Sequence, residues 1–134
     1  MDEKLLSGMK LAPGGATPER LDEVEKRVGV KLPKDLRALL EKRDGGRGTV
    51  GGRSRPLWLW SADEIEREAD EQEVTRASPG LLLFGSDGGA EGYGYLPRLK
   101  RGRYGRISIM AAGAHEFESL GDSLEALVKT LAES

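Results

Sequence analysis

The stretch TPERLDEVEKRVGVKLPKDLRALLEKRDGG, residues 17–46, carries the clearest structural signals in the chain. Thr17 followed by Pro18 predicts a helix start, because a threonine oxygen caps free backbone amides and proline fits the first helical position. Apolar residues then recur at helical spacing up to Val28, and Gly29 favours a left-handed helix end. These features predict a first helix between Thr17 and Gly29.

A second, shorter helix is predicted to begin at Pro33. Leu36, Leu39 and Leu40 would share one face of this helix, and the pair Gly45–Gly46 would stop it. The stretch is therefore expected to form a helix pair.

The sequence before the helix pair is interrupted by Pro13, Gly14 and Gly15, a combination that breaks regular structure. We expect residues 1–16 to form a flexible N-terminal arm and residues 17–134 to form a single domain. A chain of 134 residues suits one ordinary domain with one core.

Strands are predicted further along the chain. The glycine- and arginine-rich segment 47–56 predicts a mobile loop, and the segment 57–60 predicts a strand. The unbroken apolar run 81–84 predicts a central strand covered on both faces, and the glycine-rich segment 85–89 predicts a turn. Apolar and aromatic residues at alternate positions predict further strands around Tyr93, Tyr95, Ile107 and Ile109.

A C-terminal helix completes the order of elements, with Asp122 and Glu125 as its predicted cap pair. Its apolar stripe comprises Leu120, Leu124, Leu127, Val128 and Leu131. Short turns between consecutive strands predict an α+β fold with a small, mainly antiparallel sheet covered by helices. The predicted core includes Leu21, Val24, Leu36, Leu40, Leu82, Phe84, Ile107, Leu124 and Leu127.

The composition limits the possible chemistry. There is no cysteine, and His115 is the single histidine. A disulfide framework is therefore excluded, and a histidine zinc site or a catalytic triad is disfavoured. We expect no catalytic residue, no cofactor and no metal, and we expect that the protein is not an enzyme.

The charge balance and hydropathy indicate a cytoplasmic protein. The 21 basic and 23 acidic residues give a net charge of −2, so there is no overall bias toward nucleic acid. No apolar run approaches the length of a membrane span or the core of a secretion signal.

The helix-pair stretch resembles the opening signature of the SMI1/KNR4 family in the SUKH superfamily, above all at residues 28–37 and 44–46. Later segments follow in the family's order, at residues 57–65, 84–89 and 122–127. The resemblance implies an α+β fold and, for most bacterial members, an immunity protein that binds and neutralises a cognate toxin. Fungal members instead act as regulatory adaptors. The family has no shared catalytic constellation to carry over.

An acidic helix is the main candidate for partner binding. Ser61 with Glu64 has the capping-box pattern, and Ile65 and Ala69 would form a narrow apolar stripe. Seven acidic residues with only Arg67 between them place like charges one turn apart, which opposes helix stability and suggests a basic partner. The predicted partner-binding residues are Asp63, Glu64, Glu66, Glu68, Asp70, Glu71 and Glu73. We expect Glu66, Asp70 and Glu71, which lie off the stripe, to tolerate charge reversal without loss of the fold.

Segment 98–106 is strongly basic, with Arg98, Lys100, Arg101, Arg103 and Arg106, and Tyr104 is available there to stack on a base. A solvated turn, a protein contact and a nucleic-acid contact all remain open for it.

Three further signals have ordinary explanations. Residues 46–51 match a dinucleotide fingerprint, but they follow a predicted helix instead of a strand. His115 beside Glu116 suggests a surface residue more than an acid–base pair. Trp58 and Trp60 share a strand face, where core packing is favoured over an exposed anchor.

The sequence thus predicts an immunity protein that occludes a cognate bacterial toxin, polymorphic or contact-delivered, with a nuclease as one candidate. The toxin would carry a basic surface, and the free protein would be a monomer that binds neither nucleic acid nor membrane. A regulatory adaptor for a housekeeping partner is the alternative, followed by a nucleic-acid-binding protein.

Overall fold

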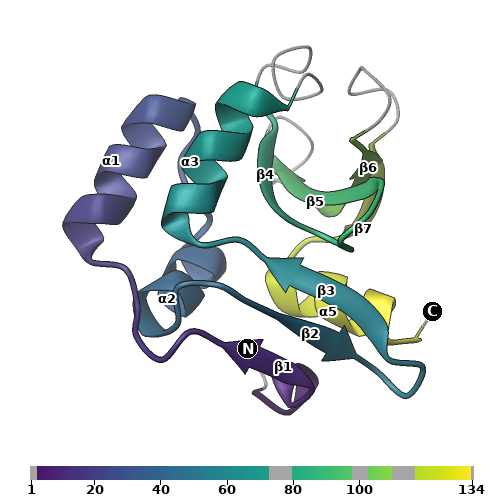
Figure 1. Ribbon diagram of the computed structural model, residues 1–134. Helices are drawn as coiled ribbons and strands as arrows, with labels where there is room; N and C mark the ends of the chain where they lie inside the picture. Colours follow the sequence, from purple (N-terminus) through teal and green to yellow (C-terminus); the bar gives the residue numbers. More distant parts are fainter. Residues whose placement is uncertain (1–2, 73–79, 98–102, 110–116, 134) are drawn as a thin grey trace.

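The computed structural model describes residues 3–72, 80–97, 103–109 and 117–133 of the chain (Figure 1). Its helices are η1 (Glu3–Leu6), α1 (Pro18–Val28), α2 (Lys34–Lys42), α3 (Ala62–Glu71) and α5 (Leu124–Glu133). Its strands are β1 (Met9–Leu11), β2 (Gly46–Val50), β3 (Arg55–Leu59), β4 (Leu82–Ser86), β5 (Glu91–Leu96), β6 (Arg103–Ser108) and β7 (Glu118–Gly121).

The predicted helix pair is confirmed by α1 and α2. The Thr17 side chain accepts a hydrogen bond from the Arg20 backbone N–H at 3.1 Å, which caps the start of α1. Gly29 ends α1 in the left-handed conformation, with φ at 81°. Local signals therefore fix both ends of α1.

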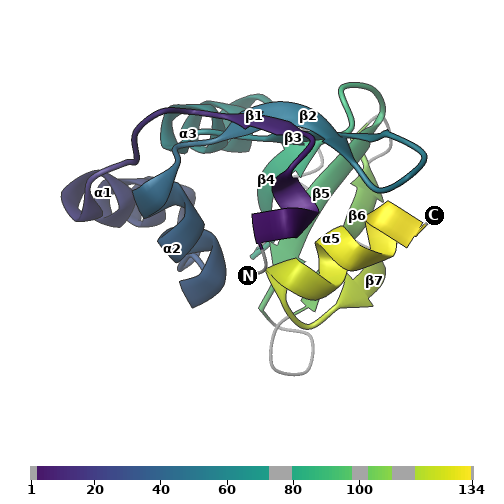
Figure 2. The ribbon, with the colours of Figure 1, turned by 90° about the horizontal axis from the view of Figure 1, so that it is seen from below.

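The strands form one antiparallel sheet in which neighbours in the chain are neighbours in space, from β1 to β7. The sheet curves around α5, which contacts η1, β2, β6 and β7 (Figure 2). On the other side of the molecule, α1 packs on α3 and α3 packs on β4. The α+β prediction is confirmed.

The predicted core is confirmed in full, since all nine of its residues are at most 1% exposed. Of the run 81–84, predicted as a central strand, residues 82–84 lie in β4, in which every residue is buried. β4 occupies the middle of the seven-stranded sheet, between β3 and β5. Gly85 and Ser86, predicted to belong to a turn, lie in this strand.

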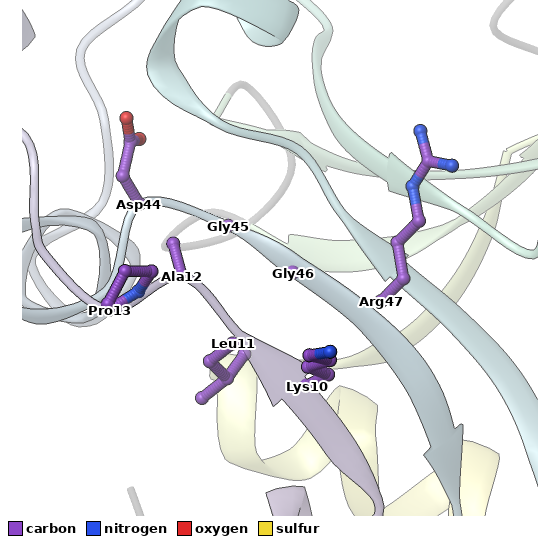
Figure 3. A pocket seen from close by; sticks show the side chains of 8 residues that line it. All are labelled: Lys10, Leu11, Ala12, Pro13, Asp44, Gly45, Gly46 and Arg47. Atoms are coloured by element: carbon purple, nitrogen blue, oxygen red, sulfur yellow. The ribbon is translucent and has the colours of Figure 1, made fainter.

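The prediction of a mobile loop at residues 47–56 is wrong, because β2 and β3 pair there as a hairpin. The glycines that suggested a loop permit close packing instead. A Cβ at Gly48 would collide with the carbonyl oxygen of Gly8 beside β1, and one at Gly51 would collide with that of Ala132 in α5. Figure 3 shows β1 and β2 side by side, with Lys10 and Arg47 projecting from them.

The predicted C-terminal helix is confirmed, but it begins only at Leu124 and its cap is different. The Ser123 hydroxyl, and not Asp122, accepts a hydrogen bond from the Ala126 backbone N–H at 3.0 Å. Leu120, predicted to belong to the helical stripe, lies in β7. The other four stripe residues are buried.

The segment expected to form the N-terminal arm contains η1 and β1. β1 pairs with β2, and Leu6 is buried in the core. The boundary between arm and domain at residue 16 stays a prediction. No helix in the described ranges is long and apolar enough to cross a membrane.

Asp35, at the start of α2, joins three elements. Its carboxylate accepts hydrogen bonds from the Tyr104 hydroxyl of β6 and from the backbone N–H of Leu124 at 2.8 Å. It also accepts one from the N–H of Leu36 at 2.9 Å. Burial and the hydrogen bond to Asp35 raise the pKa of Tyr104 above its usual range. One carboxylate thus anchors the start of α5 to both α2 and the sheet.

Replacing Leu82 with alanine should lower the free energy of unfolding by about 2 to 5 kcal/mol, because it leaves a cavity in the central strand. Urea denaturation measures the change. Leu39→Ala, at a partly buried position on α2, is the control and should cost less. A loss below about 1 kcal/mol for Leu82→Ala would contradict the central position of β4.

Tyr104→Phe should destabilise the protein by about 1 to 2 kcal/mol near neutral pH, through loss of the hydrogen bond to Asp35. Its pKa is raised in the folded state, so Tyr104 stabilises the fold fully below about pH 10 and loses this contribution as the pH rises further. The stabilities of wild type and variant should therefore converge as the pH rises above about 10 in urea denaturation. The pKa of Tyr93 is also raised by burial, but Tyr93 is present in both proteins and its titration therefore does not change the difference between them. Parallel pH dependence would contradict the assignment.

Candidate functional site

The acidic helix predicted to bind a partner is α3. Its capping box is confirmed: the Ser61 hydroxyl accepts from the Glu64 N–H at 3.2 Å, and the Glu64 carboxylate accepts from the Ser61 N–H at 3.0 Å. The Asp44 carboxylate accepts a further hydrogen bond from the Ala62 N–H at 2.8 Å. Ile65 is buried as predicted, and Ala69 is half-buried. One of the acidic residues of α3, Glu64, therefore caps the N-terminus of its own helix.

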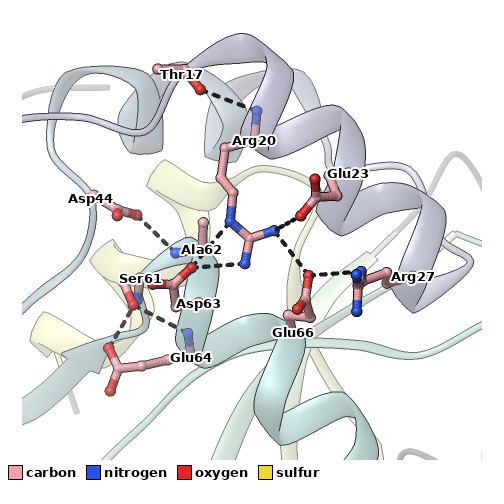
Figure 4. Close-up of polar contacts among 10 residues, drawn as sticks. All are labelled: Thr17, Arg20, Glu23, Arg27, Asp44, Ser61, Ala62, Asp63, Glu64 and Glu66. Carbon is pink, nitrogen blue, oxygen red and sulfur yellow. Dashed lines mark hydrogen bonds and ion pairs between the residues drawn. The ribbon is translucent and has the colours of Figure 1, made fainter.

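A second part of the acidic character joins α3 to α1 through Arg20 (Figure 4). The Arg20 guanidinium donates to Asp63 at 2.7 Å, to Glu66 at 2.9 Å and to Glu23 at 3.0 Å. Arg27 lies 3.7 Å from the same Glu66 carboxylate. Hydrogen bonds to Glu66 and Asp63 raise the pKa of Arg20 further above its usual value. We call this group the α1–α3 clasp.

The clasp corrects the prediction for Glu66. Its side chain is only 22% exposed, whereas the sequence suggested a position that tolerates charge reversal. The carboxylates of Asp63 and Glu66 are paired with arginines of α1, so their mutual repulsion is offset across the helix interface. The charge pattern of α3 is in part a packing feature.

The remaining acidic residues lie toward the end of α3. Glu68 accepts a hydrogen bond from the Gln72 side chain at 2.6 Å and lies 3.7 Å from Arg67. Asp70 and Glu71 are exposed and form no ion pair with any described residue. Glu73 lies outside the described residues. Of the predicted set, Asp70 and Glu71 are thus the described carboxylates left open to a partner.

The basic segment is described only from Arg103 onward; Arg98, Lys100 and Arg101 lie outside the described residues. Tyr104 is buried, with its ring edge-on to Phe84, so the prediction that it can stack on a base is wrong. Arg106 donates to Glu118 of β7 at 2.6 Å, which raises the pKa of Arg106. This cross-strand pair accounts for one of the basic residues.

Sequence reasoning missed the outward face of the β2–β3 hairpin, because it treated residues 47–56 as a loop. The Arg47 guanidinium lies over the Trp58 ring, 4.0 Å from its centre. Trp60 lies just beyond the end of β3 and is buried in the core, so the predicted core packing is confirmed for Trp60. Trp58 lies in β3 and is only half-buried, so the two residues do not share a strand face. The adjacent β-branched residues Thr49 and Val50 are the signal that could have revealed the strand.

A pocket of about 490 Å³ lies beside Arg47 and Lys10 (Figure 3). Its apolar lining comes from Leu11, Ala12 and Pro13. Within the described ranges, no three acidic or histidine side chains are grouped to hold a metal ion. His115 and Glu116 lie outside the described residues. The dinucleotide-like residues 46–51 form β2 and the start of its turn, not the start of a helix.

Comparison with known families matches residues 15–130 to the model described as the SMI1 / KNR4 family (SUKH-1). The match covers both helices of the opening pair, the entire hairpin and most of α5. A search of curated proteins finds no match.

Glu66→Lys should destabilise the protein by about 1 to 2 kcal/mol, because it breaks the partly buried clasp and places a third cation beside Arg20 and Arg27. Asp70→Lys with Glu71→Lys is the matched comparison. This double variant should change the free energy of unfolding by less than about 0.5 kcal/mol, because both positions are exposed. The new lysines would also interact favourably with the helix dipole, since α3 has no basic residue in its last turn. Thermal or urea unfolding distinguishes the two; equal effects would refute the clasp.

Proposed function

Because the chain belongs to the SMI1/KNR4 family (SUKH-1), a family generally associated with immunity proteins, we propose that it binds and neutralises a cognate bacterial toxin by stoichiometric occlusion. The family match over residues 15–130 is the observation that carries this proposal. Occlusion needs no chemistry from the immunity protein. It needs a surface of about 800 Å² that fits the toxin in shape and charge.

The end of α3 is the proposed centre of that surface. Among Asp63, Glu64, Glu66, Glu68, Asp70, Glu71 and Glu73, the first four have hydrogen-bonding or ion-pairing roles within the protein. Asp70 and Glu71 are exposed, so their charge acts on the solvent and on an approaching partner. A basic toxin surface would be attracted to this end of the helix.

The clasp supports the proposal in a second way. It holds α3 against α1, while the capping box and Asp44 fix the start of the helix. The exposed carboxylates at the far end are therefore presented from a rigid element. A rigid surface loses less conformational entropy on binding than a mobile one.

Co-expression with the product of an adjacent toxin gene tests the function. The protein should restore growth and should co-purify with the toxin at a fixed stoichiometry. A toxin that stays active in the presence of excess protein would contradict the immunity role.

Asp70→Lys with Glu71→Lys should slow association with such a toxin by about tenfold at low salt and reduce the salt dependence of the rate. Stopped-flow or surface-based kinetics measure both. Asp122→Lys with Glu133→Lys makes the same change in net charge at exposed positions flanking and ending α5, and serves as the control. If the control slows association as much as the α3 variant, the interface does not centre on α3.

A further inference from the structure

Lys10, Arg47 and Trp58 form a row across three neighbouring strands, which we call the outer row. The register pairs Lys10 with Arg47 and Arg47 with Trp58. Directly paired residues project from the same face of a sheet, so the three side chains share one face. On that face the Arg47 side chain extends away from Lys10 (Figure 3) and over the Trp58 ring. The alternate residues Leu57 and Leu59 project to the opposite face and are buried in the core.

The outer row contains a pairing that opposes stability. Two cations directly opposite each other on neighbouring strands repel, yet Lys10 and Arg47 occupy such a position. Lys10 is exposed and forms no ion pair with any described residue. Arg47 is 61% exposed, and its nearest carboxylate, Glu64 at 3.8 Å, also belongs to the capping box of α3. The ion pair with Glu64 and the contact with Trp58 compensate Arg47 in part, whereas Lys10 has no such contact with any described residue. The position of Lys10 beside a second cation therefore points to a function outside the fold.

Arg47 is held in place by Trp58. The guanidinium lies over the indole ring, which restricts a side chain that would otherwise sample many rotamers. The ring is in turn supported by Gly88, which has φ at 83°; a Cβ there would lie 2.9 Å from the ring. The planar donors of Arg47 are therefore arranged in advance for a carboxylate.

The pocket beside the row supplies an apolar neighbour to these cations. Its volume is about 490 Å³, and Leu11, Ala12 and Pro13 line it between Lys10 and the α2–β2 connection. Asp44, the acidic residue in its lining, already accepts a hydrogen bond from the N–H of Ala62. The site therefore combines two cations with a shallow, largely apolar depression.

We propose that the outer row and its pocket bind an acidic segment of a protein partner, with a carboxylate on Arg47 and Lys10 and an apolar side chain in the pocket. Charge complementarity selects this occupant, because Lys10 and Arg47 place two exposed positive charges on one face of the sheet. The apolar lining of the pocket favours a peptide over a polyphosphate. The charge of this site is opposite to that of the end of α3, and the proposal for it does not depend on the proposed function.

The test uses two octapeptides with blocked ends, one alternating glutamate and leucine and the other alternating lysine and leucine. Titration is followed by NMR through the indole N–H signal of Trp58, assigned from the spectrum of Trp58→Phe. The glutamate peptide should shift this signal and the lysine peptide should not. Arg47→Met, which keeps an apolar stem over the ring, should weaken binding at least about tenfold.

Lys10→Met should weaken binding by a smaller factor, and Lys31→Met, at an exposed position outside the row, is the control and should leave it unchanged. The proposal is overturned if neither peptide binds, if both bind equally, or if Arg47→Met and Lys31→Met have the same effect. It is also overturned if the Trp58 signal shifts with protein concentration alone, which would indicate a second copy of the chain. Tighter binding of single-stranded DNA than of the glutamate peptide would assign the row to nucleic acid instead.

Discussion

The carboxylate of Asp35 is the interaction on which the arrangement of helices and sheet depends. It accepts from Tyr104 in β6, from Leu124 at the start of α5 and from Leu36 in its own helix. Asp35 and Leu124 are 89 residues apart in the chain, so this one side chain sets where the last helix begins relative to the first pair. An ionised acceptor makes stronger hydrogen bonds than a neutral one, and the buried Tyr104 hydroxyl would be costly to leave unpaired.

The charges of this protein divide into those that hold the fold together and those that face outward. On α3, Asp63 and Glu66 belong to the α1–α3 clasp and Glu64 to the helix cap, whereas Asp70 and Glu71 remain exposed. On α1 and α2, Arg37 likewise lies between Asp22 and Glu25. The sequence alone does not distinguish a paired carboxylate from an exposed one, because the basic partner of a paired carboxylate lies on another element. A run of like charge is therefore poor evidence for an interface until its counter-ions are located.

The hairpin of β2 and β3 shows the same division between its two faces. Its inner face carries Leu57, Leu59 and Val50 into the core, and its glycines let β1 and α5 approach closely. Its outer face carries Arg47 over Trp58. The composition of segment 47–56 favoured a loop because glycine has low strand propensity. Tertiary packing overrides that preference where a larger residue would not fit.

The sequence by itself determined the ends of α1, the start of α3, the apolar stripes of the helices apart from Leu120, and all nine predicted core residues, together with the family. These features depend on residues three or four positions apart, or on a pattern of burial along one element, which a linear sequence displays directly. The tertiary structure alone decided which carboxylates of α3 remain open, that Tyr104 is buried, and that Lys10, Arg47 and Trp58 lie in one row. Those outcomes depend on contacts such as that between Arg20 and Asp63, 43 residues apart, and on the register of neighbouring strands. Neither the long-range contacts nor the strand register can be read from local spacing, because the partner of each side chain is set only when the elements pack together.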